Sequence, residues 1–184
     1  MNIGLALPPD PAQAVAWAAQ AERAGIGHLW MADDPTADAL PTLAAVARVT
    51  TTPRLGVLDL DVVRRPPSLL AKGLATLDVL SHGRLAVRLK SLPDPRQLDE
   101  AITILVGLFT GGPFTFSGVH WSVQEARCLP LPVQRPHPPL RTGPAVIAAW
   151  PTDPTAMQQG VEDLILRARD AGDVSTIAAA CNLA

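Results

Sequence analysis

Tyrosine is absent from this 184-residue sequence, aromatic residues make up only 4% of it, and cysteine occurs just twice. The two cysteines, Cys128 and Cys181, lie far apart and form no Cys-x-x-Cys pair, which argues against a zinc site or a disulfide framework. The four histidines are scattered without metal-ligand spacing. We therefore expect free thiols, no metal site, and a location in the reducing cytoplasm.

An excess of charge of one sign is also missing, since the formal net charge is −2. This balance provides no electrostatic attraction toward nucleic acid or an anionic membrane. No apolar run is long enough to span a membrane, and Asp10-Pro11 comes too early for a signal peptide. We expect a protein without nucleic-acid or membrane partners, folded as one domain over residues 1–184.

Apolar segments suited to strands alternate with segments suited to helices over the first part of the chain. The predicted strands are 3–7, 28–32, 55–60 and 85–89, and the predicted helices are 11–24, 39–50, 66–80 and 95–109. The strands are continuously apolar, which is typical of a parallel sheet with helices on its outer faces. The periodicity allows either an open doubly wound sheet or a barrel. No G-x-G-x-x-G follows the first strand, which disfavours a dinucleotide-binding fold.

The pattern changes after residue 113. Residues 114–123 alternate around Ser117-Gly118 and predict a β-hairpin. The proline-rich segment that follows must be extended, because each proline fixes its own φ and restricts the preceding residue. The remaining predictions are a strand at 140–142, an apolar segment at 145–150, a helix at 154–171, and a segment at 174–183 that suits either strand or helix.

Arg64 to Leu89, RRPPSLLAKGLATLDVLSHGRLAVRL, combines a proline-initiated helix, a glycine stop and an apolar strand. Its order of Arg-x-Pro, Leu-Ala-Lys and Ala-Thr-Leu-Asp-x-Leu-Ser-x-Gly-Arg resembles the luciferase-like flavin- and F420-dependent oxidoreductases. The hairpin followed by a proline-rich segment resembles the same family. The resemblance implies a TIM-like (β/α) barrel with a β-hairpin insertion.

A complete barrel of this kind has about 250 residues. Compared with that pattern, this shorter chain implies a truncated or incomplete barrel, in which a helix and a strand are missing after Gly143 and the final helix is absent. The resemblance also implies that residues 174–183 form a strand. Relatives pair through two helices that correspond to 39–50 and 66–80, so we expect a homodimer through these helices.

In barrel enzymes the site lies at the carboxyl ends of the strands. We predict Asp33 and Asp59 as catalytic carboxylates, and Asp59, Arg64, Ser91 and Gly143 as cofactor contacts. Purely structural roles are the alternatives. Asp33 could belong to a solvated loop, Arg64 could pair with a neighbouring helix, and Gly143 could be a turn residue. Many relatives carry Glu-His where this chain has Asp33-Asp34.

The resemblance implies a luciferase-like oxidoreductase or monooxygenase that uses reduced flavin (FMN) or F420 on a small organic substrate. Arg88 to Ser91 stands where relatives carry glycines that let the backbone approach a flavin, so we expect weak cofactor binding. Two other hypotheses remain. The chain could be a degenerate barrel that binds a ligand or catalyses a redox-neutral step without flavin, or it could be a non-catalytic partner subunit.

Overall fold

The computed structural model describes residues 2–143, 145–149 and 163–183. Its large sheet is built from β1 (Asn2–Ala6), β2 (His28–Ala32), β3 (Arg54–Leu60), β4 (Leu85–Leu89), β7 (Leu140–Arg141), β8 (Val146–Ala149) and β9 (Asp163–Arg167). The strands follow the order β7-β4-β3-β2-β1-β9-β8, and every neighbouring pair is parallel. The four strands predicted in the first half are confirmed.

The helices of the described residues are α1 (Pro11–Arg23), α2 (Ala39–Val49), α3 (Pro67–Leu80), α4 (Pro95–Phe109) and α5 (Ala171–Leu183). Asp10, Asp38 and Asp94 cap the first, second and fourth of them by accepting a hydrogen bond from a backbone N–H of the first turn. None of these helices has both the length and the apolar character needed to cross a membrane.

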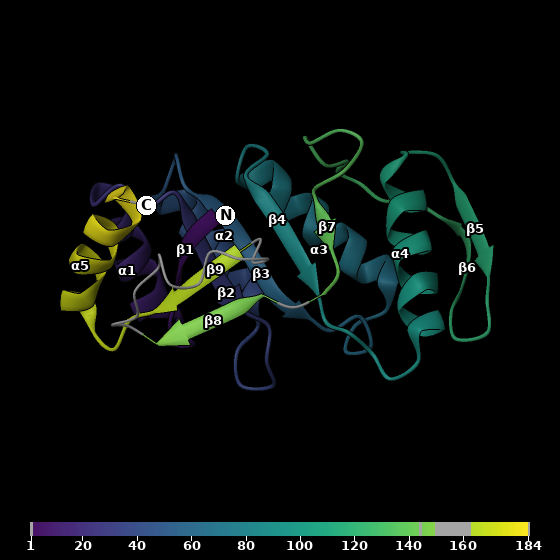
Figure 1. Cartoon of the computed structure of the whole chain (residues 1–184). Helices are drawn as coiled ribbons and strands as arrows, with labels where there is room; N and C mark the ends of the chain where they lie inside the picture. The colour runs from purple at the N-terminus through teal and green to yellow at the C-terminus, as the bar shows by residue number, and fades with distance from the viewer. Residues whose placement is uncertain (1, 144, 150–162, 184) are drawn as a thin grey trace.

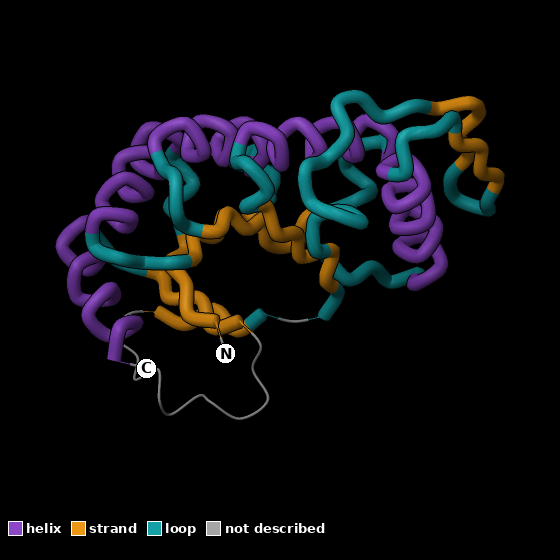
Figure 2. The backbone as a smooth tube through the Cα atoms, turned by 90° about the horizontal axis from the view of Figure 1, so that it is seen from above, coloured by secondary structure: helices purple, strands orange, loops and turns teal. Residues whose placement is uncertain are grey.

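The sheet is strongly curved, and Figure 2 shows its strands forming an arc with helices along the outer side. In the described residues β7 and β8 are the two border strands, although only residues 142–145 separate them in the chain. So short a link has no room for a further helix and strand, which fits the truncated barrel that the resemblance implied. The architecture is an incomplete TIM-like barrel, and Figure 1 shows its elements in order.

Three predictions for the last part of the chain are wrong. Residues 163–167 form β9 instead of the end of a helix, and residues 174–183 lie in α5 instead of a strand. Leu164 to Leu166 are all fully buried between β1 and β8, which suits a strand covered on both faces. The final helix is thus present, and it packs against α1 and β1. Residues 154–162 of the predicted helix lie outside the described residues.

The sheet separates two apolar layers. Most of the core lies between the outer side of the strands and the helices. The inner side holds a small cluster of Trp30, Leu58, Ala86 and Ile165. Glycines on β1 and β3 make room for the indole, because a Cβ atom at Gly56 would overlap the Trp30 ring. Trp30 therefore fills the inner side of the curved sheet.

The predicted hairpin is confirmed as an antiparallel pair, β5 (Phe114–Ser117) and β6 (Ser122–Ala126). The Glu100 carboxylate on α4 holds its turn by accepting backbone N–H groups of Val119, His120 and Trp121 at 2.8, 2.9 and 3.1 Å. Burial alone would raise the pKa of Glu100, but these three hydrogen bonds keep it below its ordinary value. The hairpin is therefore attached to α4, at the side of the sheet.

Candidate active site

The carboxyl ends of β2, β3 and β4 open onto a cavity of about 530 Å³. It is lined by Asp33, Asp34, Pro35, Asp59, Leu89, Lys90, Ser91 and Gly143. Four of the five predicted site residues, Asp33, Asp59, Ser91 and Gly143, thus meet in one place. The fifth, Arg64, does not line the cavity but contacts one of its walls through Asp33.

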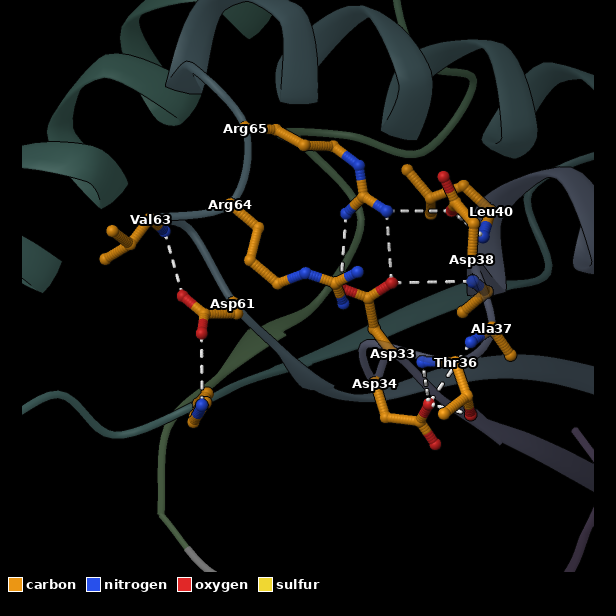
Figure 3. Close-up of polar contacts among 12 residues, drawn as sticks. Asp33, Asp34, Thr36, Ala37, Asp38, Leu40, Asp61, Val63, Arg64 and Arg65 are labelled. Carbon is orange, nitrogen blue, oxygen red and sulfur yellow. Dashed lines mark hydrogen bonds and ion pairs between the residues drawn. The ribbon is translucent and has the colours of Figure 1, made fainter.

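Asp33 lies just beyond β2, and two arginines from the β3–α3 connection bind its carboxylate (Figure 3). Arg65 donates from Nη1 and Nη2 to the two carboxylate oxygens at 3.1 Å each, and Arg64 donates at 3.3 Å. Arg65 also pairs with Asp38 at 2.8 Å, and these charged contacts raise the pKa of its guanidinium. The Asp33 side chain is fully buried. Its oxygens are therefore committed to holding the β2–α2 connection against the β3–α3 connection.

Asp34 closes a tight turn beside this ion cluster. Its carboxylate accepts hydrogen bonds from the Thr36 hydroxyl and from the backbone N–H groups of Thr36 and Ala37. The Thr36 hydrogen bonds are the main reason why the pKa of Asp34 lies below its ordinary value. The prediction of a solvated loop suits this residue, whereas Asp33 is buried in the ion cluster.

Asp59 differs from both of these carboxylates. The pairing of β3 with β4 shifts register between Val57 and Leu60, and Asp59 lies in this bulge. Its φ of +52° is in the left-handed backbone region that residues other than glycine rarely adopt. The residue is exposed on the cavity wall, and no hydrogen bond or ion pair of its carboxylate occurs among the described residues. A bulge that redirects an unpartnered carboxylate toward a cavity is typical of a binding position.

The opposite wall of the cavity is formed by the end of β4. Lys90 donates to Asp61 at 3.0 Å. Burial alone would raise the pKa of Asp61, but hydrogen bonds from the Val63 N–H and from Lys90 bring it below its ordinary value. Arg88 is buried, and its Nη1 donates to the Gly143 carbonyl at 3.0 Å. Arg88 thus connects β4 to the short link between β7 and β8.

Gly143 has a φ of +96°, and an added Cβ atom would have no neighbour within 4 Å. Its conformation is that of a turn residue, as one of the alternatives held, and its position on the cavity wall also suits contact with a ligand. Ser91 follows Lys90 on the same wall and is exposed. Both residues remain predictions as cofactor contacts.

A second cavity, of about 310 Å³, adjoins the first, and Asp34 lines both. Its apolar lining comes from β1, β2, β3 and the segments around them, and includes Leu7, Trp17, Met31 and Leu58. Arg167, Arg169 and Gln13 add polar groups. The two arginines were not predicted as site residues because residues 154–171 were expected to form a helix. Ile165 and Arg167 are two residues apart and would share one face of a strand. This spacing was the signal that could have identified Arg167.

Comparison with known proteins finds similarity mainly in the first half of the chain. The family model described as luciferase-like monooxygenase matches residues 3–90, the segment that carries β1 to β4 and most residues that line the larger cavity. An uncharacterized protein of Mycobacterium tuberculosis is 30% identical over 119 residues, which is 57% of this chain and 41% of the relative. The FMNH2-dependent dimethylsulfone monooxygenase of Pseudomonas putida is 32% identical over 100 residues, which is 45% of this chain and 28% of that enzyme.

Among solved structures, the coenzyme F420-dependent tetrahydromethanopterin reductase of Methanopyrus kandleri has the same fold, with a TM-score of 0.70 and 20% identity over 78% of this chain and 50% of that chain. The similarity confirms the resemblance inferred from Arg64 to Leu89. The family includes FMN- and F420-dependent members. This chain spans less than half the length of the curated relatives that it matches.

Proposed function

We propose, for a chain whose residues 3–90 match the luciferase-like monooxygenases, an oxidoreductase that works with bound FMN or F420 on a small organic molecule. One observation carries the proposal: Asp33, Asp59, Ser91 and Gly143, predicted as site residues from the sequence, line one cavity at the carboxyl ends of β2 to β4. Parallel α/β sheets bind their ligands at this edge.

The residues at the mouth suit an aromatic ring. Pro35 and Leu89 give the larger cavity its apolar surface, and Ala6 and Ala32, which pack beside the inner cluster that contains Trp30, line the adjoining smaller cavity. A flat cofactor needs such an apolar floor with a few polar groups at its edge. Asp59 and Ser91 are exposed polar groups of this kind on the larger cavity, and Lys90 is held beside them by Asp61. The described residues therefore fit the ring of a flavin or deazaflavin.

When bound, either cofactor supplies hydride transfer, and reduced flavin also supplies oxygen activation. The residues of this chain bind, orient and exclude water. The Asp59 carboxylate accepts a hydrogen bond from the ligand, and the ion cluster of Asp33 with Arg64 and Arg65 keeps the cavity wall in place. Asp33 would have to break contacts with two arginines to act as a base, so Asp59 is the better candidate for a carboxylate that contacts the reacting groups.

Cofactor affinity is expected to be low compared with that of full-length luciferase-like enzymes. The cations at the end of β4 are engaged, because Arg88 donates to Gly143 and Lys90 pairs with Asp61. A phosphate would have to compete for them. The approach of a ring is also limited by side chains at residues 88–91, where backbone contact requires glycine.

The test is titration of the purified protein with FMN and with F420, followed by absorbance and fluorescence. We expect weak, saturable binding of one of the two, and a loss of about tenfold to a hundredfold in affinity or turnover for Asp59→Asn. Asp99→Asn is the matched control, because Asp99 is exposed on α4 and its carboxylate makes no contact in the described residues. Binding of neither cofactor would favour a flavin-free ligand-binding barrel or a partner subunit.

We also propose that the protein forms a homodimer through α2 and α3. These helices pack side by side and expose three large apolar side chains, with 44% of Val49, 58% of Leu69 and 36% of Leu80 accessible. Gly73 lies between them on α3, where its missing side chain lets Leu40 approach closely. A second copy of this surface would cover the exposed apolar groups.

A further inference from the structure

The smaller cavity is lined by a guanidinium group that has no role in the proposed cofactor site. Arg167 is the last residue of β9 and lines the 310 Å³ cavity. No hydrogen bond or ion pair of its guanidinium occurs within the described residues, whereas the guanidinium groups of Arg64, Arg65, Arg88 and Arg169 are all engaged. An unpaired guanidinium next to apolar side chains is suited to an anionic partner.

We propose that this cavity binds the substrate as a small organic anion, with its acidic group on Arg167 and its apolar part against Leu58, Met31 and Ile147. The assignment of this anion as the substrate rests on the proposed oxidoreductase function. Its binding rests only on the residues that line the cavity.

The strand geometry explains why Arg167 reaches this place. Side chains two residues apart on a strand share a face, and Ile165 belongs to the inner cluster around Trp30. Arg167 is therefore on the inner face, one step closer to the mouth, and its backbone pairs with Ala6 of β1 and Ala149 of β8. The small side chain at Ala6 leaves space for the longer arginine beside it.

None of the other charged groups around the cavity pairs with Arg167 in the described residues. The Asp34 carboxylate accepts hydrogen bonds from Thr36 and Ala37 at Oδ1. Arg169 is bound to Asp173 by two hydrogen bonds, of 2.9 and 3.0 Å, and 67% of its side chain is exposed. Of the two arginines that line the cavity in the described residues, Arg167 is thus the one available to an anion.

The two cavities are electrostatically different, and this difference separates substrate from cofactor. The larger one presents an unpartnered carboxylate, Asp59, which repels a phosphate or carboxylate. The smaller one presents an unpartnered guanidinium and is about 310 Å³ in volume, at the lower end of the range for ligand pockets. Because Asp34 lines both, a molecule in the smaller cavity lies next to a ring in the larger one.

The experiment is isothermal titration calorimetry of the whole chain, without cofactor, with hexanoate, hexanesulfonate and the neutral hexanamide. We expect both anions to bind more tightly than the amide. Arg167→Gln should weaken the anions about tenfold to a hundredfold and leave the amide unchanged. Arg127→Gln is the matched control, since Arg127 is exposed after β6 and lines neither cavity, and it should bind the anions like the parent protein. Circular dichroism of each variant shows whether it is folded.

Three outcomes would overturn the proposal: equal binding of anion and amide, absence of anion binding, or unchanged anion affinity in folded Arg167→Gln. A fourth uses FMN and riboflavin, which differ by a phosphate. If Arg167→Gln weakens FMN but not riboflavin, the anion on Arg167 belongs to the cofactor and the substrate assignment is wrong. A protein that binds hexanoate through Arg167 but binds neither FMN nor F420 would keep the anion site and reject the redox function.

Discussion

Replacement of Asp33 by asparagine separates a structural from a catalytic role for this residue. The substitution keeps the shape of the side chain and removes its charge. Asparagine keeps one acceptor oxygen but puts an NH2 donor in place of the other, so the two contacts of Arg65 at 3.1 Å and that of Arg64 at 3.3 Å cannot all persist, and those that do lose their ionic partner, at a position where the aspartate side chain is fully buried. Because the arginines stay in place, the variant leaves positive charge without its central partner.

Removal of one member of a buried ion pair costs about 3–5 kcal/mol. Arg65 keeps Asp38 at 2.8 Å, and Asp38 is half exposed, so we expect the lower end of this range, about 3 kcal/mol. For a chain of this size, each kcal/mol corresponds to about 2–4 °C in melting temperature, and we therefore expect a decrease of about 6–12 °C.

The assay combines thermal unfolding followed by circular dichroism with cofactor titration at a temperature where both proteins are folded. Asp59→Asn is the control, because that carboxylate has no partner among the described residues, and its stability should stay within about 0.5 kcal/mol of the parent. If Asp33→Asn melted like the parent protein but lost cofactor binding or turnover, the ion cluster would not be structural and the catalytic prediction for Asp33 would gain support.

Three further predictions concern other parts of the chain. Gly56→Ala puts a methyl group into the Trp30 ring and should lower the free energy of unfolding, measured by urea denaturation, by about 1–3 kcal/mol. Gly27→Ala is the control, because nothing lies within 4 Å of the added atom and its stability should not change. Equal urea midpoints for the two variants would contradict the close contact between Gly56 and Trp30. Burial alone would raise the pKa of Glu22, but hydrogen bonds from Thr51 and Thr52 lower it from 4.5 to about 2. This stabilisation is present above the unfolded pKa and is lost as the pH falls toward 2, so the parent protein should lose more stability than Glu22→Gln over that window, and parallel acid curves would refute it. Leu69→Asp should convert the proposed dimer into a monomer in light scattering, while Thr103→Asp on the exposed face of α4 controls for the effect of an added charge on a helix outside the proposed surface. A parent protein that is already monomeric at micromolar concentration would remove the proposal.

The first half of the fold could be predicted because local signals and burial agree there. Asp10, Asp38 and Asp94 mark helix starts in the sequence and act as caps in the structure. The strands are short apolar runs between these helices, and a parallel sheet covered on its outer side requires nothing else. The proposed location of the site followed from the same logic, since each predicted residue stands near or after the carboxyl end of a predicted strand.

The last part could not be predicted in the same way because its signals are ambiguous. Leu164, Ile165 and Ala168 fit the spacing of a helix face, yet the first two are in β9. What decides between the two is the pairing with β1, from the other end of the chain, and no local pattern reports it. The roles of Asp33 and Asp59 were inaccessible for a similar reason, because only the folded chain places two arginines on one carboxylate and none on the other.

The position of the first strand in the sheet has a consequence for the order in which this chain folds during synthesis. Leu5 of β1 pairs with Leu29 of β2 on one side and with Leu166 of β9 on the other. The first of these partners leaves the ribosome soon after β1, but the second follows only when almost the whole chain has been made. For most of translation, β1 therefore presents an open apolar edge to the cell, which is the kind of surface that chaperones bind and that aggregates if they do not.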